Sequence, residues 1–158
     1  MNKLKIALLL CMGSLGTGLY AQEHTGMKAG SEKHILINTD KLQWTDAPAA
    51  LPKGAKVALL EGNPSEAGPF TIRLQIPAGY EIKPHWHPAI EHVSVLKGDF
   101  YMGSGETFNK ESAMKLSEGG FASMPVKFVH YAFSTSGATI QLHGIGPWAA
   151  GIYLLFCL

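Results

Sequence analysis

The chain has 158 residues, of which 46% are hydrophobic and 16% are charged, and these proportions are typical of a folded domain rather than of a disordered segment. Its 13 lysines and arginines nearly balance its 12 acidic residues, so the composition gives no indication of a nucleic-acid partner or an acidic binding surface. The length leaves room for one domain with a core of its own.

Residues 1–21 are predicted to be a secretory signal peptide. Lys3 and Lys5 provide a short positive start, and an apolar run over residues 6–20 ends at Ala21. A retained membrane anchor is the alternative, but the run has about 15 residues and a spanning helix needs about 20. We therefore expect cleavage after Ala21, a periplasmic or secreted protein, and no membrane attachment of the mature chain. Cleavage removes two lysines and leaves 11 basic (13 − 2) and 12 acidic residues.

The two cysteines fall on opposite sides of the predicted cleavage site. Cys11 lies in the leader, where the bulky Leu10 before it argues against a lipoprotein signal. Only Cys157 remains in the mature chain, which therefore cannot form an internal disulfide bond.

The mature chain is predicted to be all-β after a flexible N-terminus at residues 22–38, which is polar and has no hydrophobic period. The clearest strand covers residues 70–76, where apolar residues alternate with Thr71, Arg73 and Gln75. Other short strands are expected at residues 56–60, 91–96, 100–102, 121–124, 130–135, 138–144 and 153–156. Eighteen glycines and nine prolines between such strands favour an antiparallel barrel or sandwich.

Two connections can also be predicted. Lys97-Gly98-Asp99 is typical of a tight hairpin between the strands on either side. Residues 39–54 are expected to form an irregular lead-in to a single domain that covers residues 39–158.

His85, His87 and Glu91 are candidate metal ligands. All three occupy odd-numbered positions, so on an extended chain their side chains would point to one face. Nitrogen and oxygen ligands without cysteine argue against a structural zinc site and suit one divalent transition metal, which can be Fe, Mn, Ni, Cu or Zn. His130 is the candidate for a fourth ligand, from another strand. The alternative is that His85 and His87 lie in an exposed loop and bind nothing.

The same segment resembles the first signature of the cupin superfamily at each of its defining positions: Gly79, His85, His87, Glu91 and Gly98. The second signature is matched more loosely, by Gly119, Pro125 and His130. Lys127 stands where the superfamily usually has glycine, and Ser134 where it usually has asparagine. Three further stretches, residues 44–48, 68–87 and 144–147, resemble single-domain secreted bacterial cupins that mostly lack an assigned reaction.

The resemblance implies a small antiparallel β-barrel of jelly-roll type. It also implies that His85, His87, Glu91 and His130 hold one divalent metal inside the barrel, and that the chain can form a homodimer through its sheets.

The residues around the signature are expected to be structural. Val93 and Val95 would lie in the core, His92 and His143 on the surface, and Trp86 on the outside of the barrel rather than against a substrate. For His143, a role beside the metal ligands is the alternative.

Two functions follow from the cupin resemblance. The first is an exported metal-dependent oxidoreductase of the dioxygenase type, which acts on a small oxygenated organic molecule and uses Glu91 as a general base as well as a ligand. The second is a barrel that binds or senses a small molecule through its metal without turnover. A metal that only stiffens the barrel is a third possibility.

Overall fold

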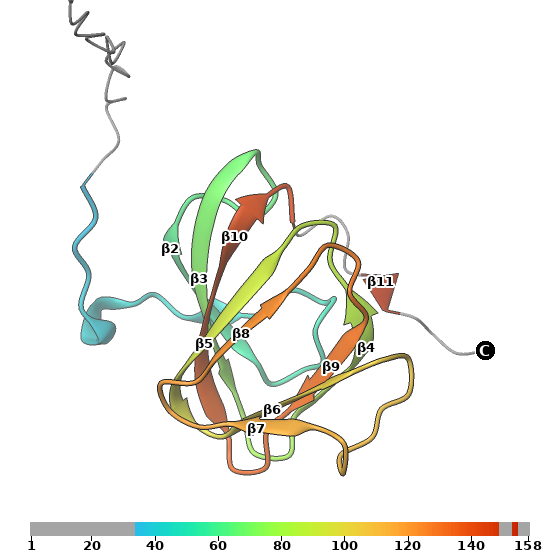
Figure 1. Ribbon diagram of the computed structural model, residues 1–158. Helices are drawn as coiled ribbons and strands as arrows, with labels where there is room; N and C mark the ends of the chain where they lie inside the picture. Colours follow the sequence, from blue (N-terminus) through green and yellow to red (C-terminus); the bar gives the residue numbers. More distant parts are fainter. Residues whose placement is uncertain (1–33, 149–152, 155–158) are drawn as a thin grey trace, which may run out of the picture. The chain divides into compact units, whose positions relative to one another are not determined.

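Strands make up nearly all the regular structure of this chain in the computed structural model, which describes residues 34–148 and the backbone of residues 153–154 (Figure 1). The elements are η1 (Thr39–Lys41), β1 (Thr45–Asp46), β2 (Lys56–Glu61), β3 (Gly68–Ile76), β4 (Glu81–Trp86), β5 (Glu91–Gly98), β6 (Phe100–Ser104), β7 (Met114–Leu116), β8 (Phe121–Met124), β9 (His130–Phe133), β10 (Ala138–Gly146) and β11 (Tyr153–Leu154). The described residues from Ile35 onward belong to one compact unit. The predicted signal peptide and Cys157 lie outside the described residues.

The strands form two antiparallel sheets. One sheet has the order β1-β2-β3-β10-β5-β8 and the other has the order β11-β4-β9-β6-β7 (Figure 1). Among the described strands, no pairing joins one sheet to the other, so hydrogen bonds do not close the two sheets into a continuous barrel. The all-β, antiparallel jelly-roll prediction is confirmed. The part of the chain that the structure describes contains no apolar helix of membrane-spanning length.

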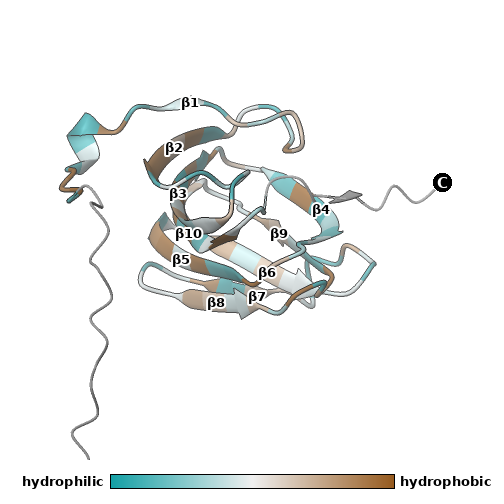
Figure 2. Ribbon diagram, turned by 90° about the horizontal axis from the view of Figure 1, so that it is seen from above, coloured by the Kyte–Doolittle hydropathy of each residue, from teal (hydrophilic) through white to brown (hydrophobic). Residues whose placement is uncertain are grey.

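The core lies between the two sheets and follows from the alternation of side chains along the strands. Ile140 in β10 pairs with Leu74 in β3 on one side and with Val95 in β5 on the other, and all three are buried. Figure 2 shows hydrophobic and hydrophilic residues alternating along β5. Because each such side chain stabilises the fold by about 1.5–3 kcal/mol when fully buried, these three central strands contribute much of the hydrophobic stabilisation. The predicted core positions of Val93 and Val95 are confirmed.

The predicted hairpin at residues 97–99 is wrong. β5 pairs with β10 and β8 in one sheet, whereas β6 pairs with β9 and β7 in the other. The chain therefore crosses between the sheets at Asp99, whose carboxylate accepts hydrogen bonds from Ser134 Oγ at 2.8 Å and Thr135 Oγ1 at 2.6 Å. A short connection between two strands has the same local composition whether the strands pair or separate, so the sequence could not distinguish the two cases.

The irregular lead-in at residues 39–54 is confirmed apart from η1 and the short β1, which pairs with β2. Tyr80 ties this segment to the rest of the unit, because its hydroxyl donates a 2.6 Å hydrogen bond to the carbonyl of Pro52. β4 and β7 were not among the predicted strands. β4 is polar and contains Pro84, which breaks the usual strand pattern, and β7 has only three residues.

Candidate metal centre

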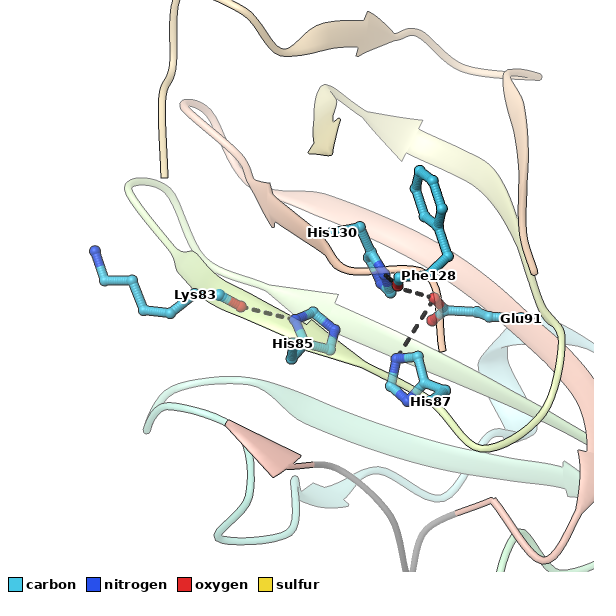
Figure 3. A network of polar contacts seen from close by, with 6 residues as sticks. All are labelled: Lys83, His85, His87, Glu91, Phe128 and His130. Atoms are coloured by element: carbon cyan, nitrogen blue, oxygen red, sulfur yellow. Dashed lines mark hydrogen bonds and ion pairs between the residues drawn. The ribbon is translucent and has the colours of Figure 1, made fainter. Parts of the chain in front are cut away.

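The four predicted ligands come together from both sheets. His85 lies near the end of β4, His87 follows that strand, Glu91 begins β5 and His130 begins β9. His85 and His130 are cross-strand neighbours in the β4–β9 pair. Figure 3 shows the imidazoles and the Glu91 carboxylate turned toward one another. The argument from odd-numbered positions on one strand is wrong for Glu91, because the chain turns after His87 and enters the other sheet.

The three histidines form a compact, buried cluster. Their relative exposures are 5%, 3% and 2% for His85, His87 and His130, and one ligand nitrogen from each lies within 4.8 Å of the others. Glu91 borders the cluster, with its Oε2 3.5 Å from His87 Nε2 and 3.1 Å from His130 Nε2. The alternative that His85 and His87 lie in an exposed loop is excluded by their burial.

Two of the imidazoles are oriented by hydrogen bonds to the backbone. His85 Nδ1 lies 2.7 Å from the carbonyl of Lys83, and His130 Nδ1 lies 2.9 Å from the carbonyl of Phe128 (Figure 3). Because a carbonyl can only accept, Nδ1 carries the proton in both rings. Each Nε2 is then left as the nitrogen that can bind a metal.

The buried environment separates the proton affinities of the three rings. Burial and then the neighbouring His130 lower the pKa of His85 from 6.5 to about 4. Burial, His85 and His130 lower the pKa of His87 from 6.5 to about 3. Burial also acts to lower the pKa of His130, but the hydrogen bond and charge of Glu91 outweigh it, and the pKa of His130 is raised. Two of the three imidazoles are therefore neutral nitrogen donors at neutral pH.

The donor set fits a divalent cation. His87 Nε2 and Glu91 Oε2 are buried and have no hydrogen bond of good geometry within the described part of the chain. Imidazole lone pairs that face a carboxylate repel it unless a proton or a cation lies between them, and burying such atoms without a partner is unfavourable. A metal bound by these residues would satisfy both atoms at once. The three histidines, with Glu91 beside them, are the residues that can hold it.

The cluster opens into a largely apolar cavity of about 510 Å³. His85, His87, Glu91 and His130 form its polar part. Most of the wall is hydrophobic and includes Leu51, Val57, Ile72, Leu142 and Trp148. The cavity can therefore receive a small organic molecule next to the candidate metal ligands.

Of the residues predicted to be structural, Val93 lines this cavity as part of its apolar wall, whereas His92, His143 and Trp86 do not line it. The His92 and His143 rings stack at 4.7 Å on the outer face of the larger sheet, where His143 is exposed, so the role of His143 beside the metal ligands is excluded. Trp86 is half-buried and does not line the cavity.

Sequence reasoning missed Trp148, whose ring stacks on His87 with 4.2 Å between centroids. Trp148 directly follows the stretch 144–147, but nothing in that stretch indicates a contact with a residue 61 positions earlier (148 − 87).

The two departures from the second cupin signature have clear structural roles. Lys127 has a φ of 59°, the left-handed conformation that glycine adopts most easily, and its N–H donates to the carbonyl of His87 at 2.9 Å. Ser134 is fully buried, and its hydroxyl donates to Asp99 while it accepts from the N–H of Gly137 at 2.9 Å. Both positions therefore support turns rather than supply ligands.

Comparison with known families agrees with this geometry. The ChrR cupin-like domain family matches residues 32–144, which is more than half of the chain. The chain belongs to this family of cupins. No curated protein matches the chain.

Solved structures similar to this cupin include three with different descriptions. The polyketide cyclase RemF from Streptomyces resistomycificus has a TM-score of 0.65 and 11% identity, over 80% of this chain and 88% of that one. An acetylacetone dioxygenase from Acinetobacter johnsonii has a TM-score of 0.59 and 19% identity, over 80% and 82%. An RmlC-like cupin from Shewanella frigidimarina has a TM-score of 0.56 and 16% identity, over 72% and 91%. At these identities the similarity shows the fold alone.

Proposed function

We propose that this cupin is an exported metal-dependent oxidoreductase of the dioxygenase type that acts on a small oxygenated organic molecule. The observation that carries the proposal is the position of three buried imidazoles at the polar end of a largely apolar cavity of about 510 Å³. A purely structural metal would not need such a space beside it. The acetylacetone dioxygenase of similar fold is in keeping with this choice, although its low identity carries no substrate over.

His85, His87 and His130 would hold the metal, with Glu91 as the fourth ligand. When bound, a divalent metal supplies Lewis acidity and a template on which an oxygenated substrate and dioxygen can meet. A ligand set of three nitrogens and one oxygen favours Fe, Mn, Ni, Cu or Zn over the hard cations Mg and Ca.

The cavity wall contributes binding and exclusion of water. Side chains such as Leu51, Ile72 and Leu142 favour the hydrocarbon part of a ligand, while its oxygen atoms would turn toward the histidine cluster. The volume lies within the range of about 300–1,000 Å³ that is usual for small-molecule sites. We therefore expect a compact substrate with two neighbouring oxygen atoms, such as a diketone.

Glu91 would take up a proton from such a substrate. Its Oε2 is buried, lines the same cavity as the histidines and lies 3.1 Å from His130 Nε2. Once released from the metal, this carboxylate can accept an acidic C–H or O–H proton from a bound molecule. Glu91 would then act as a general base as well as a ligand.

An oxygen-uptake screen tests the proposal. The protein would be purified without added metal or chelator, analysed for its metal, and then loaded separately with Fe²⁺, Ni²⁺ or Mn²⁺. We expect oxygen consumption with a diketone or flavonol that is lost in His130→Ala and kept in His143→Ala, because His143 lies on the outer face. Ligand binding without any oxygen consumption would instead favour the non-catalytic binding or sensing barrel. Export and homodimer formation stay predictions.

A further inference from the structure

The three histidines of the centre are not held in the same way. His85 and His130 each place Nδ1 within 2.9 Å of a backbone carbonyl, which fixes the ring and its tautomer. Nδ1 of His87 is also buried, but it has no hydrogen-bond partner among the described residues. The hydrogen bond from Nδ1 that usually orients a metal-binding imidazole is therefore missing at His87 among the described residues.

His87 is instead covered by an aromatic ring. The indole of Trp148 and the imidazole of His87 are stacked, with 4.2 Å between centroids and 19° between planes. The side-chain torsion that turns an imidazole is broad, so an unbonded ring can rotate unless something blocks it. With the indole against one face, rotation of the His87 ring would drive its edge into Trp148.

Trp148 is itself firmly placed. It is 5% exposed, and its backbone N–H donates to the carbonyl of Pro64 at 2.6 Å. Phe70 packs against the indole with 5.3 Å between ring centroids. Gly146 allows the close approach of the loop that contains Pro64, because a Cβ at residue 146 would lie 2.0 Å from the carbonyl oxygen of Glu66. Because these contacts fix the position of Trp148, its indole can restrain the neighbouring imidazole of His87.

We propose that Trp148 is the positioning residue that orients His87 for metal binding, by ring stacking in place of the hydrogen bond that orients His85 and His130. The inference rests on the metal centre proposed above. It assigns a function to a residue that supplies no ligand atom and that lies 61 positions from His87 in the sequence (148 − 87).

Binding of Co²⁺ by the whole protein tests the proposal without any assay of activity. The variants are Trp148→Phe, which keeps a ring, and Trp148→Leu, which keeps an apolar side chain without a ring. Trp86→Leu is the matched control, because Trp86 lies between His85 and His87 in the sequence but outside the cavity. Circular dichroism and thermal melting would establish that each variant is folded.

We expect Trp148→Leu to bind Co²⁺ about 10–100-fold more weakly than wild type, as is usual when the support of a metal-binding histidine is removed. The visible absorption bands of the bound Co²⁺ should change in Trp148→Leu, since one nitrogen is lost or displaced. Trp148→Phe should restore both the affinity and the spectrum, and Trp86→Leu should leave them unchanged. A folded Trp148→Leu protein with wild-type affinity and spectrum would overturn the proposal.

A second measurement uses the metal-free protein labelled with ¹⁵N-histidine. We expect His87 to give one defined set of ring signals in wild type and Trp148→Phe, and averaged or doubled signals in Trp148→Leu. His85 and His130 should be unaffected, because backbone carbonyls hold them. If the wild-type protein bound no metal at all, the proposed function would be wrong. The measurement on metal-free protein would still show whether Trp148 orients the His87 ring. Unchanged His87 signals in Trp148→Leu would contradict that role.

Discussion

Glu91 Oε2 lies 3.1 Å from His130 Nε2, although β5 and β9 belong to different sheets. This contact joins the two sheets at the polar end of the cavity and places an acceptor beside the one imidazole of the three whose pKa is raised. The proposed metal centre therefore depends on how the two sheets face each other, and variants of these residues test the proposed ligand set.

Replacement of His130 by alanine should remove the metal. The change deletes one of the three buried imidazoles and leaves Glu91 without its partner, so we expect metal affinity to fall by at least about 10–100-fold. Elemental analysis of protein purified without chelator measures the content. His143→Ala is the matched control, because His143 is exposed on the outer face. Wild-type metal content in a folded His130→Ala protein would show that His130 is not a ligand.

Metal affinity should fall as the pH is lowered, and this decrease should reflect mainly the protonation of one imidazole, that of His130. The pKa of His85 is about 4 and that of His87 about 3, so both are neutral well above those values. The pKa of His130 is raised by Glu91 above its usual 6.5, so the metal must displace a proton from His130 as the pH falls below that raised value. We expect affinity for Co²⁺ to drop about tenfold per pH unit there.

Competition with a coloured chelator between pH 5 and 8 measures this dependence. In Glu91→Gln the charge that raises the pKa of His130 is gone, so the decline should move to lower pH even if the affinity itself is weaker. A drop of about a thousandfold per unit near pH 6.5 would contradict the prediction, because it would mean that all three rings titrate together.

Asp99→Asn should destabilise the fold by about 2 kcal/mol. The carboxylate accepts hydrogen bonds from Ser134 Oγ, Thr135 Oγ1 and backbone N–H groups, and an amide can replace only part of this set. Urea denaturation at pH 7 measures the loss. Asp46→Asn is the control, since it removes a carboxylate from an exposed pair with Lys56 and should change stability by less than about 1 kcal/mol.

The same carboxylate should make stability depend on pH in the acid range. The hydrogen bond from Thr135 and those from Ser134 and Ser136 outweigh burial and hold the pKa of Asp99 well below its usual 3.8. A lowered pKa contributes stability above the unfolded-state value, and this contribution is lost as the pH falls below about 4. The gap in stability between wild type and Asp99→Asn should therefore shrink in acid. A gap that stayed constant down to pH 2 would contradict this assignment.

Lys127→Gly should stabilise the protein by up to about 1.5 kcal/mol. A left-handed conformation costs a residue with a Cβ about 1–2 kcal/mol, and the extra entropy of unfolded glycine offsets about 0.5–1 kcal/mol of the gain. Thermal unfolding measures the change. Lys115→Gly is the control, because Lys115 lies within β7, where glycine should destabilise. A lower melting temperature for Lys127→Gly than for wild type would show that the Lys127 side chain contributes more than its conformation costs.

We propose that the protein is exported and that its mature chain begins at Gln22. Intact-mass measurement of the periplasmic or secreted fraction should give a chain that lacks residues 1–21, because Ala21 closes the predicted signal peptide. Ala21→Arg should block cleavage and leave the longer chain. Recovery of only the full-length mass from wild type would argue for a retained N-terminus instead.

Much of the fold could be predicted from local patterns. Apolar residues alternate over residues 70–76, and the structure has β3 there, because a half-buried strand repeats its side chains every two residues. The same rule failed at β4, where Pro84 and His85 interrupt the alternation of apolar residues that the rule looks for. It also could not tell that β5 and β6 separate at Asp99, since pairing depends on partners that are distant in the sequence.

By itself, the sequence determined an all-β chain, because strand alternation is a local property, and its resemblance to the two cupin signatures indicated four residues suited to a metal. Only the tertiary structure decided that Glu91 and His130 approach from opposite sheets, that the cluster faces an apolar cavity, and that Trp148 covers His87. These are contacts between residues far apart in the chain. They are set by how two sheets pack together, and packing leaves no period in the sequence.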